Sequence, residues 1–213
     1  MKTKTEIQKE IVEGLQEPSH GLLRLAPRVG KTKIGIDIIK KEKPKRILWV
    51  TPNAKLRDVD IPTEFKVWRA LRYLKKTDII CYASLSTHEG RYDKIILDEY
   101  QDITISNVLP LLNGKISYET IIGLSGTHPK HREKQEIYDK LNLKFLSDMS
   151  IDEAVESNLI APYRIKVIEI DLNSTNKNVT SGSKDKPFMQ TEQEKYTYLS
   201  RLIGAKLAQN LVV

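Results

Sequence analysis

The hydrophobic residues of this chain gather in short runs that alternate with stretches of helical periodicity. The apolar runs are bounded by turn-forming residues, which is typical of strands buried on both faces. We predict such strands at 21–25, 46–50, 78–83, 94–97 and 120–124. Apolar residues three and four positions apart predict helices at 5–15, 31–41, around 65–74, at 103–113 and after Pro129. Strands that alternate with helices predict an α/β fold with a mostly parallel sheet, right-handed crossovers and helices on both faces.

Towards its end the chain changes character. Residues 165–172 form one more apolar run, and residues 173–187 are polar and rich in turn-forming types. Helical spacing resumes at 191. We therefore divide the chain into a lobe over 1–172, a polar linker or insertion over 173–190, and a helix over 191–213 that leads into a truncated second lobe.

Composition narrows the classes of function. The chain has 213 residues and a formal net charge of +7, which permits a nucleic-acid partner without establishing one. No apolar run approaches the ~18 residues that cross a bilayer, and the first residues carry mixed charge. We therefore expect a cytoplasmic protein without a membrane partner. A single cysteine, Cys81, excludes an internal disulfide and a multi-cysteine zinc site.

The sharpest local signal lies between the first predicted strand and the helix after it. The segment Leu25-Ala26-Pro27-Arg28-Val29-Gly30-Lys31-Thr32 stands where a phosphate-binding loop is required. Backbone N–H groups at Arg28, Val29 and Gly30 would hold phosphate oxygens. Lys31 would neutralise the β- and γ-phosphates of ATP, and the Thr32 hydroxyl would bind Mg²⁺. The usual pattern has glycine or a small residue at Leu25, so the intact Gly-Lys-Thr core alone leaves a chance match open.

An acid pair, Asp98 and Glu99, directly follows the predicted strand 94–97. Active sites of parallel sheets lie at the carboxyl ends of the strands. Asp98 there would reach Mg²⁺, and Glu99 would orient and deprotonate an attacking water. The alternative is a solvated pair that caps the next helix. The phosphate-loop segment upstream favours the functional interpretation, because each feature explains the other.

With both features in place, the chain resembles the first RecA-like lobe of a superfamily 2 helicase or translocase, from about residue 5 to 172. Asp98-Glu99-Tyr100-Gln101 is similar to the DExH/DEAD box, with its last two positions changed. The stretch 63–68, Thr-Glu-Phe-Lys-Val-Trp, resembles the Glu-Phe-x-x-Trp stretch of Swi2/Snf2-like members. The resemblance implies a RecA-like P-loop fold, with ATP and Mg²⁺ as cofactors.

The resemblance also assigns roles to individual residues. Gln8 stands where the family reads adenine, although a surface position on a helix is the simpler interpretation. Gln101 stands where the γ-phosphate is sensed, and the hydroxyls of Ser125 and Thr127 match the motif that couples ATP state to strand binding. Contacts with the nucleic-acid backbone fall on Thr51, Pro52, Asn53 and Ser84.

The function implied is that of an ATP-dependent helicase or translocase that moves on nucleic acid, with DNA favoured over RNA and a bacterial or phage-infected cytoplasm as the setting. Members of this superfamily hydrolyse ATP between two lobes, and the 86 residues after Thr127 cannot hold a second one. We therefore expect a piece of a longer enzyme that is weakly active or inactive alone. Two alternatives stay open: a non-motor P-loop NTPase, and a nucleic-acid-binding module that has lost catalysis.

Overall fold

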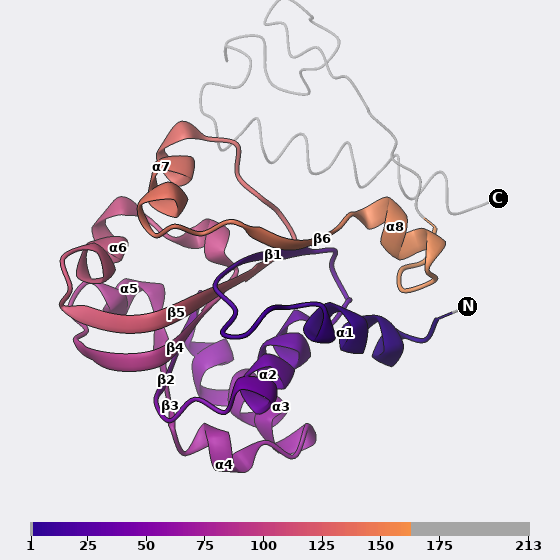
Figure 1. Ribbon diagram of the computed structural model, residues 1–213, viewed down its shortest axis with the longest axis horizontal. Helices are drawn as coiled ribbons and strands as arrows, with labels where there is room; N and C mark the ends of the chain where they lie inside the picture. Colours follow the sequence, from indigo (N-terminus) through magenta and orange to yellow (C-terminus); the bar gives the residue numbers. More distant parts are fainter. Residues whose placement is uncertain (1, 163–213) are drawn as a thin grey trace, which may run out of the picture. The chain divides into compact units, whose positions relative to one another are not determined.

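The computed structural model describes residues 2–162, which build a parallel sheet covered by helices (Figure 1). Within these residues the sheet has six strands in the order β3-β2-β4-β5-β1-β6, and all its pairings are parallel. The strands are β1 (Gly21–Leu25), β2 (Ile47–Thr51), β3 (Thr77–Cys81), β4 (Gly90–Asp98), β5 (Ile116–Ser125) and β6 (Phe145–Met149). The expected strand at 165–172, the linker at 173–190 and the segment 191–213 lie outside the described residues.

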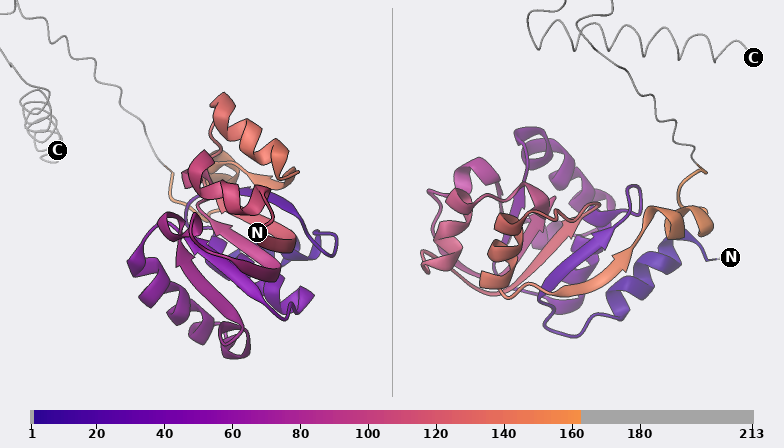
Figure 2. Two further views of the ribbon diagram at one scale, coloured as in Figure 1. Left: turned by 90° about the vertical axis from the view of Figure 1, so that its left-hand side faces the viewer. Right: turned by 90° about the horizontal axis from the view of Figure 1, so that it is seen from above.

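Helices cover both faces of the sheet (Figures 1 and 2). One face carries α1 (Lys4–Glu13), α2 (Lys31–Glu42), α3 (Ile61–Val67), α4 (Leu71–Leu74) and α8 (Ile151–Glu156). The other carries α5 (Tyr82–Leu85), α6 (Ile105–Leu112) and α7 (Arg132–Lys140). Two short segments, the π-helical η1 (Leu56–Asp60) and the 3₁₀-helical η2 (Tyr100–Asp102), complete the described part. The predicted α/β class, with helices on both faces, is confirmed.

The core consists of two layers, one on each side of the sheet. Along β2, Trp49 packs with the α1–α3 side, whereas Leu48 and Val50 pack with the α5–α7 side. Side chains of a strand alternate between faces, so a strand buried on both sides becomes a continuous apolar run. This is why the central strands could be predicted from short runs. None of the helices within residues 2–162 combines the length and apolar character that crossing a membrane requires.

Several predicted boundaries differ from the structure: β4 and β5 each begin four residues before the predicted strands, and the helical region expected around 65–74 is divided into α3 and α4. Two further differences have a local cause. Helix α1 begins at Lys4 and not at residue 5, because Thr3 and Glu6 form a reciprocal capping box in front of it. The strand expected at 78–83 ends at Cys81, and the next residues turn into the single-turn helix α5.

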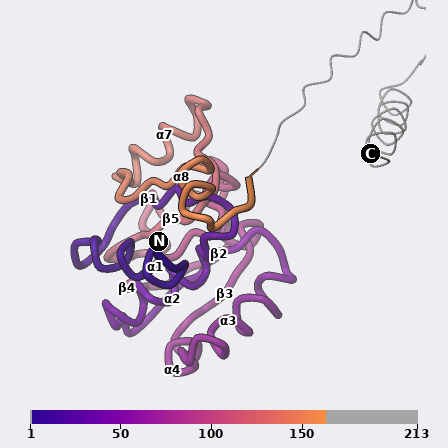
Figure 3. The backbone as a smooth tube through the Cα atoms, turned by 90° about the vertical axis from the view of Figure 1, so that its right-hand side faces the viewer, coloured from indigo at the N-terminus to yellow at the C-terminus, as the bar shows by residue number. Residues whose placement is uncertain are grey.

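Strand β6 and helix α8 were not predicted at all. Strand β6 is an edge strand that pairs only with β1 among the described strands, and its Phe145 and Leu146 remain partly exposed. It therefore lacks the apolar run that marks a central strand. Helix α8 is one and a half turns long and starts at a capping box of Ser150 and Glu153. It lies on the α1 side of the sheet (Figure 3).

Parallel pairing brings the carboxyl ends of β1, β4 and β5 to one edge of the sheet. Leu97 of β4 pairs with Gly123 of β5, so Asp98 lies beside Leu124. Arg24 of β1 pairs with Ser125. The segments that leave these three strands contain the phosphate-loop residues, the acid pair and the Ser-Gly-Thr motif. The topology therefore collects the predicted chemistry at one edge.

Candidate nucleotide-binding site

The loop between β1 and α2 has the backbone of a phosphate-binding turn. Arg28 and Gly30 both adopt left-handed conformations, with φ of 65° and 94°. A side chain at Gly30 would be strained by this φ, and its Cβ would lie 2.4 Å from Nε2 of Gln8, which would have to move. The loop ends at the N-terminus of α2, a helix of 12 residues, where Ile34 N–H donates to the Gly30 carbonyl at 3.1 Å. The N–H groups in the first turn of a helix have no partner within the helix, and together with the helix dipole they favour an anion.

Gln8 supports this loop through a hydrogen bond to the loop backbone. Its side chain is 2% exposed, and Nε2 donates to the carbonyl oxygen of Val29 at 2.6 Å. The surface position considered for Gln8 is therefore wrong. Gln8 lies on the buried side of helix α1 together with Ile7 and Val12. A pattern of hydrophobic positions does not predict burial there, because glutamine is polar.

Lys31, the second residue of the Gly-Lys-Thr core, meets the acid pair directly. Its Nζ lies 3.2 Å from Oε1 of Glu99, and both side chains are only partly exposed. Glu99 itself has a left-handed backbone, with φ 53° and ψ 58°, which few non-glycine residues adopt. This conformation turns the chain from β4 into η2 and leaves the carboxylate facing the loop.

Asp98 is the buried member of the pair. Its side chain is 4% exposed at the end of β4. Burial, and next the negative charge of Glu99, raise the pKa of Asp98 to about 6, against the opposing effect of the Lys31 ammonium. A carboxylate that is costly to ionise in the free protein is favoured as the ligand of a cation.

A chain of hydrogen bonds leads from the acid pair to β5. Gln101 Nε2 donates to Oε2 of Glu99 at 3.1 Å, and the Ser125 hydroxyl donates to the carbonyl oxygen of the same amide. The Ser125 hydroxyl in turn accepts the N–H of Thr127 at 3.0 Å. The side chain of Thr127 is exposed, so its link runs through the backbone. The structure thus brings Lys31, Glu99, Gln101, Ser125 and Thr127 together.

The four residues predicted to contact nucleic acid lie apart from this chain of bonds. Thr51 ends β2, Pro52 and Asn53 follow it, and Ser84 lies on α5 after β3. Strands β2 and β3 lie on the far side of β4 from β1. Thr51 is fully buried, and its hydroxyl has no hydrogen-bond partner among the described residues, so a side-chain contact with a nucleic acid does not fit this structure. Asn53 is exposed and uses Oδ1 to accept the N–H of Leu56 at 3.0 Å. Pro52 is half-buried, and Ser84 is exposed on α5.

The residues assigned to Mg²⁺ fit this ion by their chemistry. Asp98 offers a buried carboxylate beside a second acid, and Thr32 offers a half-buried hydroxyl at the start of α2. Mg²⁺ in phosphate sites is held by one or two protein oxygens together with phosphate oxygens and water. Within the described residues no group of three or more histidine, cysteine or acidic side chains could hold a metal without such help.

A cavity of about 290 Å³ opens beside the phosphate-binding loop. It is lined by Lys4, Thr5, Gln8, Gly30, Thr32, Lys33, Glu64 and Trp68. The sequence indicated the loop residues of this set, but it did not indicate that Glu64 and Trp68, from the end of α3, face them.

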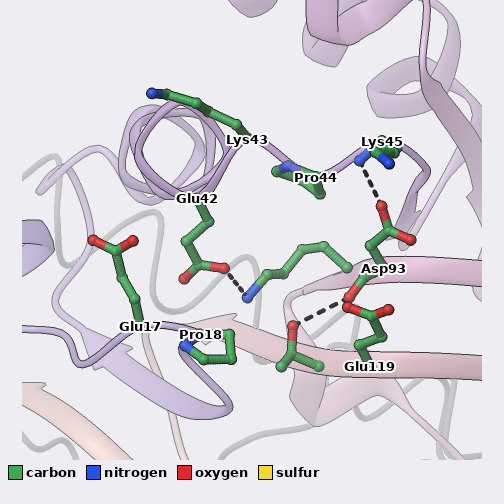
Figure 4. A pocket seen from close by; sticks show the side chains of 10 residues that line it. Glu17, Pro18, Glu42, Lys43, Pro44, Lys45, Asp93 and Glu119 are labelled. Carbon is green, nitrogen blue, oxygen red and sulfur yellow. Dashed lines mark hydrogen bonds and ion pairs between the residues drawn. The ribbon is translucent and has the colours of Figure 1, made fainter.

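A second cavity, of about 510 Å³, lies where the chain enters the strands, at the other end of the sheet (Figure 4). Its wall contains a buried ion pair between Lys94 and Glu42, with 2% and 8% of the side chains exposed. Lys94 also donates to the carbonyl of Ser19 at 2.7 Å, and the Ser19 N–H donates to Glu42 at 3.0 Å. Burial lowers the pKa of Lys94, and Glu42 opposes this effect. The pair ties α2, β4 and the segment before β1 together.

Comparison with solved structures identifies the fold. The UvsW helicase of bacteriophage T4 is similar over 66% of this chain and 58% of its own, with 15% identity and a TM-score of 0.53. The Type ISP restriction-modification enzyme LlaGI, in a nuclease-deletion mutant bound to a DNA substrate mimic, is similar over 72% of this chain and 20% of its own, with 16% identity and a TM-score of 0.53. The chain has a RecA-like α/β fold, similar to that in these two proteins.

The likeness lies in the fold, since both identities are low. The chain spans 58% and 20% of the lengths of these two proteins. No protein family model matches the chain, and no curated protein matches it.

Proposed function

We propose that this chain is the ATP-binding lobe of a nucleic-acid-dependent ATPase of the helicase or translocase type. The observation that carries the proposal is the continuous set of contacts from Lys31 through Glu99 and Gln101 to Ser125 and the Thr127 backbone. It joins a phosphate-binding loop to an acid and to a strand end in one network. The RecA-like fold supports the same assignment.

In this proposal the triphosphate binds at the loop before α2. The N–H groups of Arg28, Val29 and Gly30 and the N-terminus of α2 hold phosphate oxygens, and Lys31 neutralises the β- and γ-phosphates. Thr32 and Asp98 would hold Mg²⁺, which would neutralise phosphate charge during the reaction. Gln8 keeps the loop in position through Val29.

Glu99 is the general base of the hydrolysis. Its carboxylate accepts a proton from a water molecule, whose oxygen attacks the γ-phosphorus. The bond between that phosphorus and the β,γ-bridging oxygen breaks, and ADP leaves. In the free lobe Glu99 is paired with Lys31. A bound triphosphate gives Lys31 a stronger partner, and this releases the carboxylate for the water.

Gln101 and Ser125 connect this chemistry to the rest of the lobe. A change at the γ-phosphate that moves Glu99 alters its hydrogen bond with the Gln101 amide. This in turn alters the hydrogen bond between that amide and the hydroxyl of Ser125 at the end of β5. We assign the nucleic-acid contacts to Pro52, Asn53 and Ser84, beyond the ends of β2 and β3, and DNA is favoured over RNA. A second lobe would supply the arginines that stabilise the transition state, a contribution of about 10³–10⁵ in rate.

The test is ATP turnover by the full-length protein, with and without single-stranded DNA, double-stranded DNA and RNA, beside Lys31→Ala. We expect a nucleic acid to raise turnover at least about tenfold, and Lys31→Ala to abolish it. Turnover that is lost in Lys31→Ala but indifferent to nucleic acid would replace the proposal with a non-motor NTPase. Nucleic-acid binding without any turnover would replace it with a binding module.

A further inference from the structure

The cavity beside the phosphate-binding loop has a wall that takes no part in the phosphate or magnesium chemistry. That wall consists of Glu64, on α3, and Trp68, directly after α3, whereas Gly30 and Thr32 line the cavity from the loop and the start of α2. A ligand held by its phosphates at the loop therefore has this wall within the same hollow. The volume, about 290 Å³, is at the small end of the range for ligand pockets, which suits one ring system.

The side chains of Glu64 and Trp68 are held in place by contacts within the protein itself. The indole Nε1 of Trp68 donates to Oε2 of Glu64 at 2.6 Å, one helical turn earlier. The Trp68 backbone N–H donates to the Glu64 carbonyl at 2.9 Å, and the ring packs against the core on the α1–α3 side. Both side chains are half-buried. A prearranged aromatic surface binds a ring at little cost in side-chain entropy.

One face of the indole is electron-rich and already attracts a cation. Nζ of Lys33 lies 5.0 Å from the ring centroid and also pairs with Asp37. A planar base that stacks on this face displaces the ammonium, which keeps Asp37 as its partner. Stacking of a nucleobase on an aromatic side chain is worth about 1–3 kcal/mol.

Glu64 adds a preference among bases. One carboxylate oxygen takes the indole N–H, and the carboxylate, which lines the cavity, keeps further lone pairs with which to accept a hydrogen bond. A purine with an amino group at C6 can donate to it, whereas a 6-oxo purine presents an oxygen that the carboxylate repels.

We propose that this cavity binds the adenine base of the nucleotide, with Trp68 as the stacking surface and Glu64 as the acceptor for the 6-amino group. The inference rests on the proposed function, because the triphosphate must first bind at Lys31. It assigns base selection to α3, an element distinct from those that bind phosphate.

The experiment compares ATP, ITP and inorganic tripolyphosphate, each with Mg²⁺, by titration calorimetry of the protein. ITP differs from ATP at C6, and tripolyphosphate lacks a base, so the three separate the base from the phosphates. In Trp68→Ala we expect ATP affinity to fall about tenfold while tripolyphosphate affinity changes less than about twofold. Trp68→Phe retains an aromatic face and should recover most of the loss. In Glu64→Gln we expect the preference for ATP over ITP to shrink several-fold.

The controls separate failure of this inference from failure of the proposed function. Lys31→Ala should lose both ATP and tripolyphosphate. If Trp68→Ala weakens the two ligands equally, the wall only supports the loop, and the inference is overturned. It is also overturned if Glu64→Gln and Trp68→Ala bind ATP and ITP as the wild type does while Lys31→Ala binds neither, an outcome that leaves the proposed function standing. A wild-type protein that binds neither ATP nor tripolyphosphate overturns both.

Discussion

Nζ of Lys31 lies 3.2 Å from Oε1 of Glu99 and joins the loop after β1 to the turn after β4. The two residues are 68 positions apart in sequence, and three strands and several helices intervene. In the proposed mechanism Lys31 binds the phosphates of ATP, and Glu99 accepts a proton from the attacking water. The ion pair therefore holds both in an unreactive arrangement until a triphosphate competes for the lysine.

This pairing predicts opposite effects of Glu99→Gln on binding and hydrolysis. Loss of the carboxylate frees Lys31 for phosphate, and a partly exposed ion pair of about 0.5–1 kcal/mol corresponds to a two- to fivefold gain in ATP affinity. Loss of the general base lowers turnover by about 10²–10⁴. Calorimetry with Mg²⁺ and ATP, together with steady-state turnover, measures both.

The matched control is Glu89→Gln, which changes an exposed acid whose nearest cation is Lys115 at 3.9 Å. It should leave both quantities unchanged. If Glu99→Gln weakens ATP binding instead, Glu99 contributes to the nucleotide site itself and does not compete for Lys31.

Ser125→Ala interrupts the link between Gln101 and Thr127. The hydroxyl is fully buried, donates to Gln101 and accepts the Thr127 N–H, so its removal separates the acid pair from the segment after β5. We expect ATP affinity within about twofold of the wild type. Stimulation of turnover by nucleic acid should fall about tenfold or more in the full-length protein, a loss of about 1.4 kcal/mol of coupling. Ser117→Ala, an exposed position at the other end of β5, is the control. Unchanged stimulation in Ser125→Ala would remove Ser125 from the coupling path.

Gln8→Ala tests whether the loop needs support from α1. The variant leaves the Val29 carbonyl without its 2.6 Å donor in a buried place, which costs about 1–3 kcal/mol of stability. Because the loop loses its position, ATP affinity should fall as well. Chemical denaturation and calorimetry measure the two effects. Lys9→Ala, the exposed neighbour on α1, should show neither effect. Equal stability of Gln8→Ala and wild type would contradict the supporting role.

Asp98→Asn is expected to stabilise the protein in the absence of nucleotide and Mg²⁺. The pKa of Asp98 is raised from 3.8 to about 6 by burial, so the folded state binds its proton more tightly than the unfolded state. The wild type therefore loses stability as pH rises from about 4 to about 6, by up to about 3 kcal/mol. The asparagine variant avoids this loss.

Thermal unfolding in EDTA measures the effect. The unfolding midpoint of Asp98→Asn should exceed that of the wild type at pH 8, and the difference should shrink towards pH 4. Asp139→Asn, an exposed acid on α7, provides the comparison at each pH. A gain for Asp98→Asn that persists unchanged at pH 4 would show that ionisation of Asp98 is not its source.

The sequence predicted the parts of the fold in which local pattern and burial agree. The central strands are apolar on both faces, so β1, β2, β4 and β5 each contain a run that could be recognised. Strand β6 is an edge strand without a fully buried residue, and the single-turn helix α5 is too short for helical periodicity. These elements form because tertiary packing favours them, which a local pattern does not report.

The same division holds for the candidate site. Asp98, Glu99 and Ser125 stand at strand ends, and Lys31 follows the loop after β1. The topology of a parallel sheet brings these positions together, so the sequence could indicate them. The burial of Gln8 and of Thr51 depends on what packs over them, and so does the approach of Trp68 to the loop. Those relationships join elements through side-chain contacts between α1, α3 and the loop, and no spacing in the sequence encodes them.

The most direct test of the central claim is calorimetric titration of the protein with ATP and Mg²⁺, beside Lys31→Ala. The account predicts saturable binding at one site per chain, weakened at least about tenfold in Lys31→Ala, since the lysine ammonium forms charge-assisted bonds worth about 1.5–3 kcal/mol each. Equal binding by the two proteins, or no binding by the wild type, would contradict a nucleotide site at this loop.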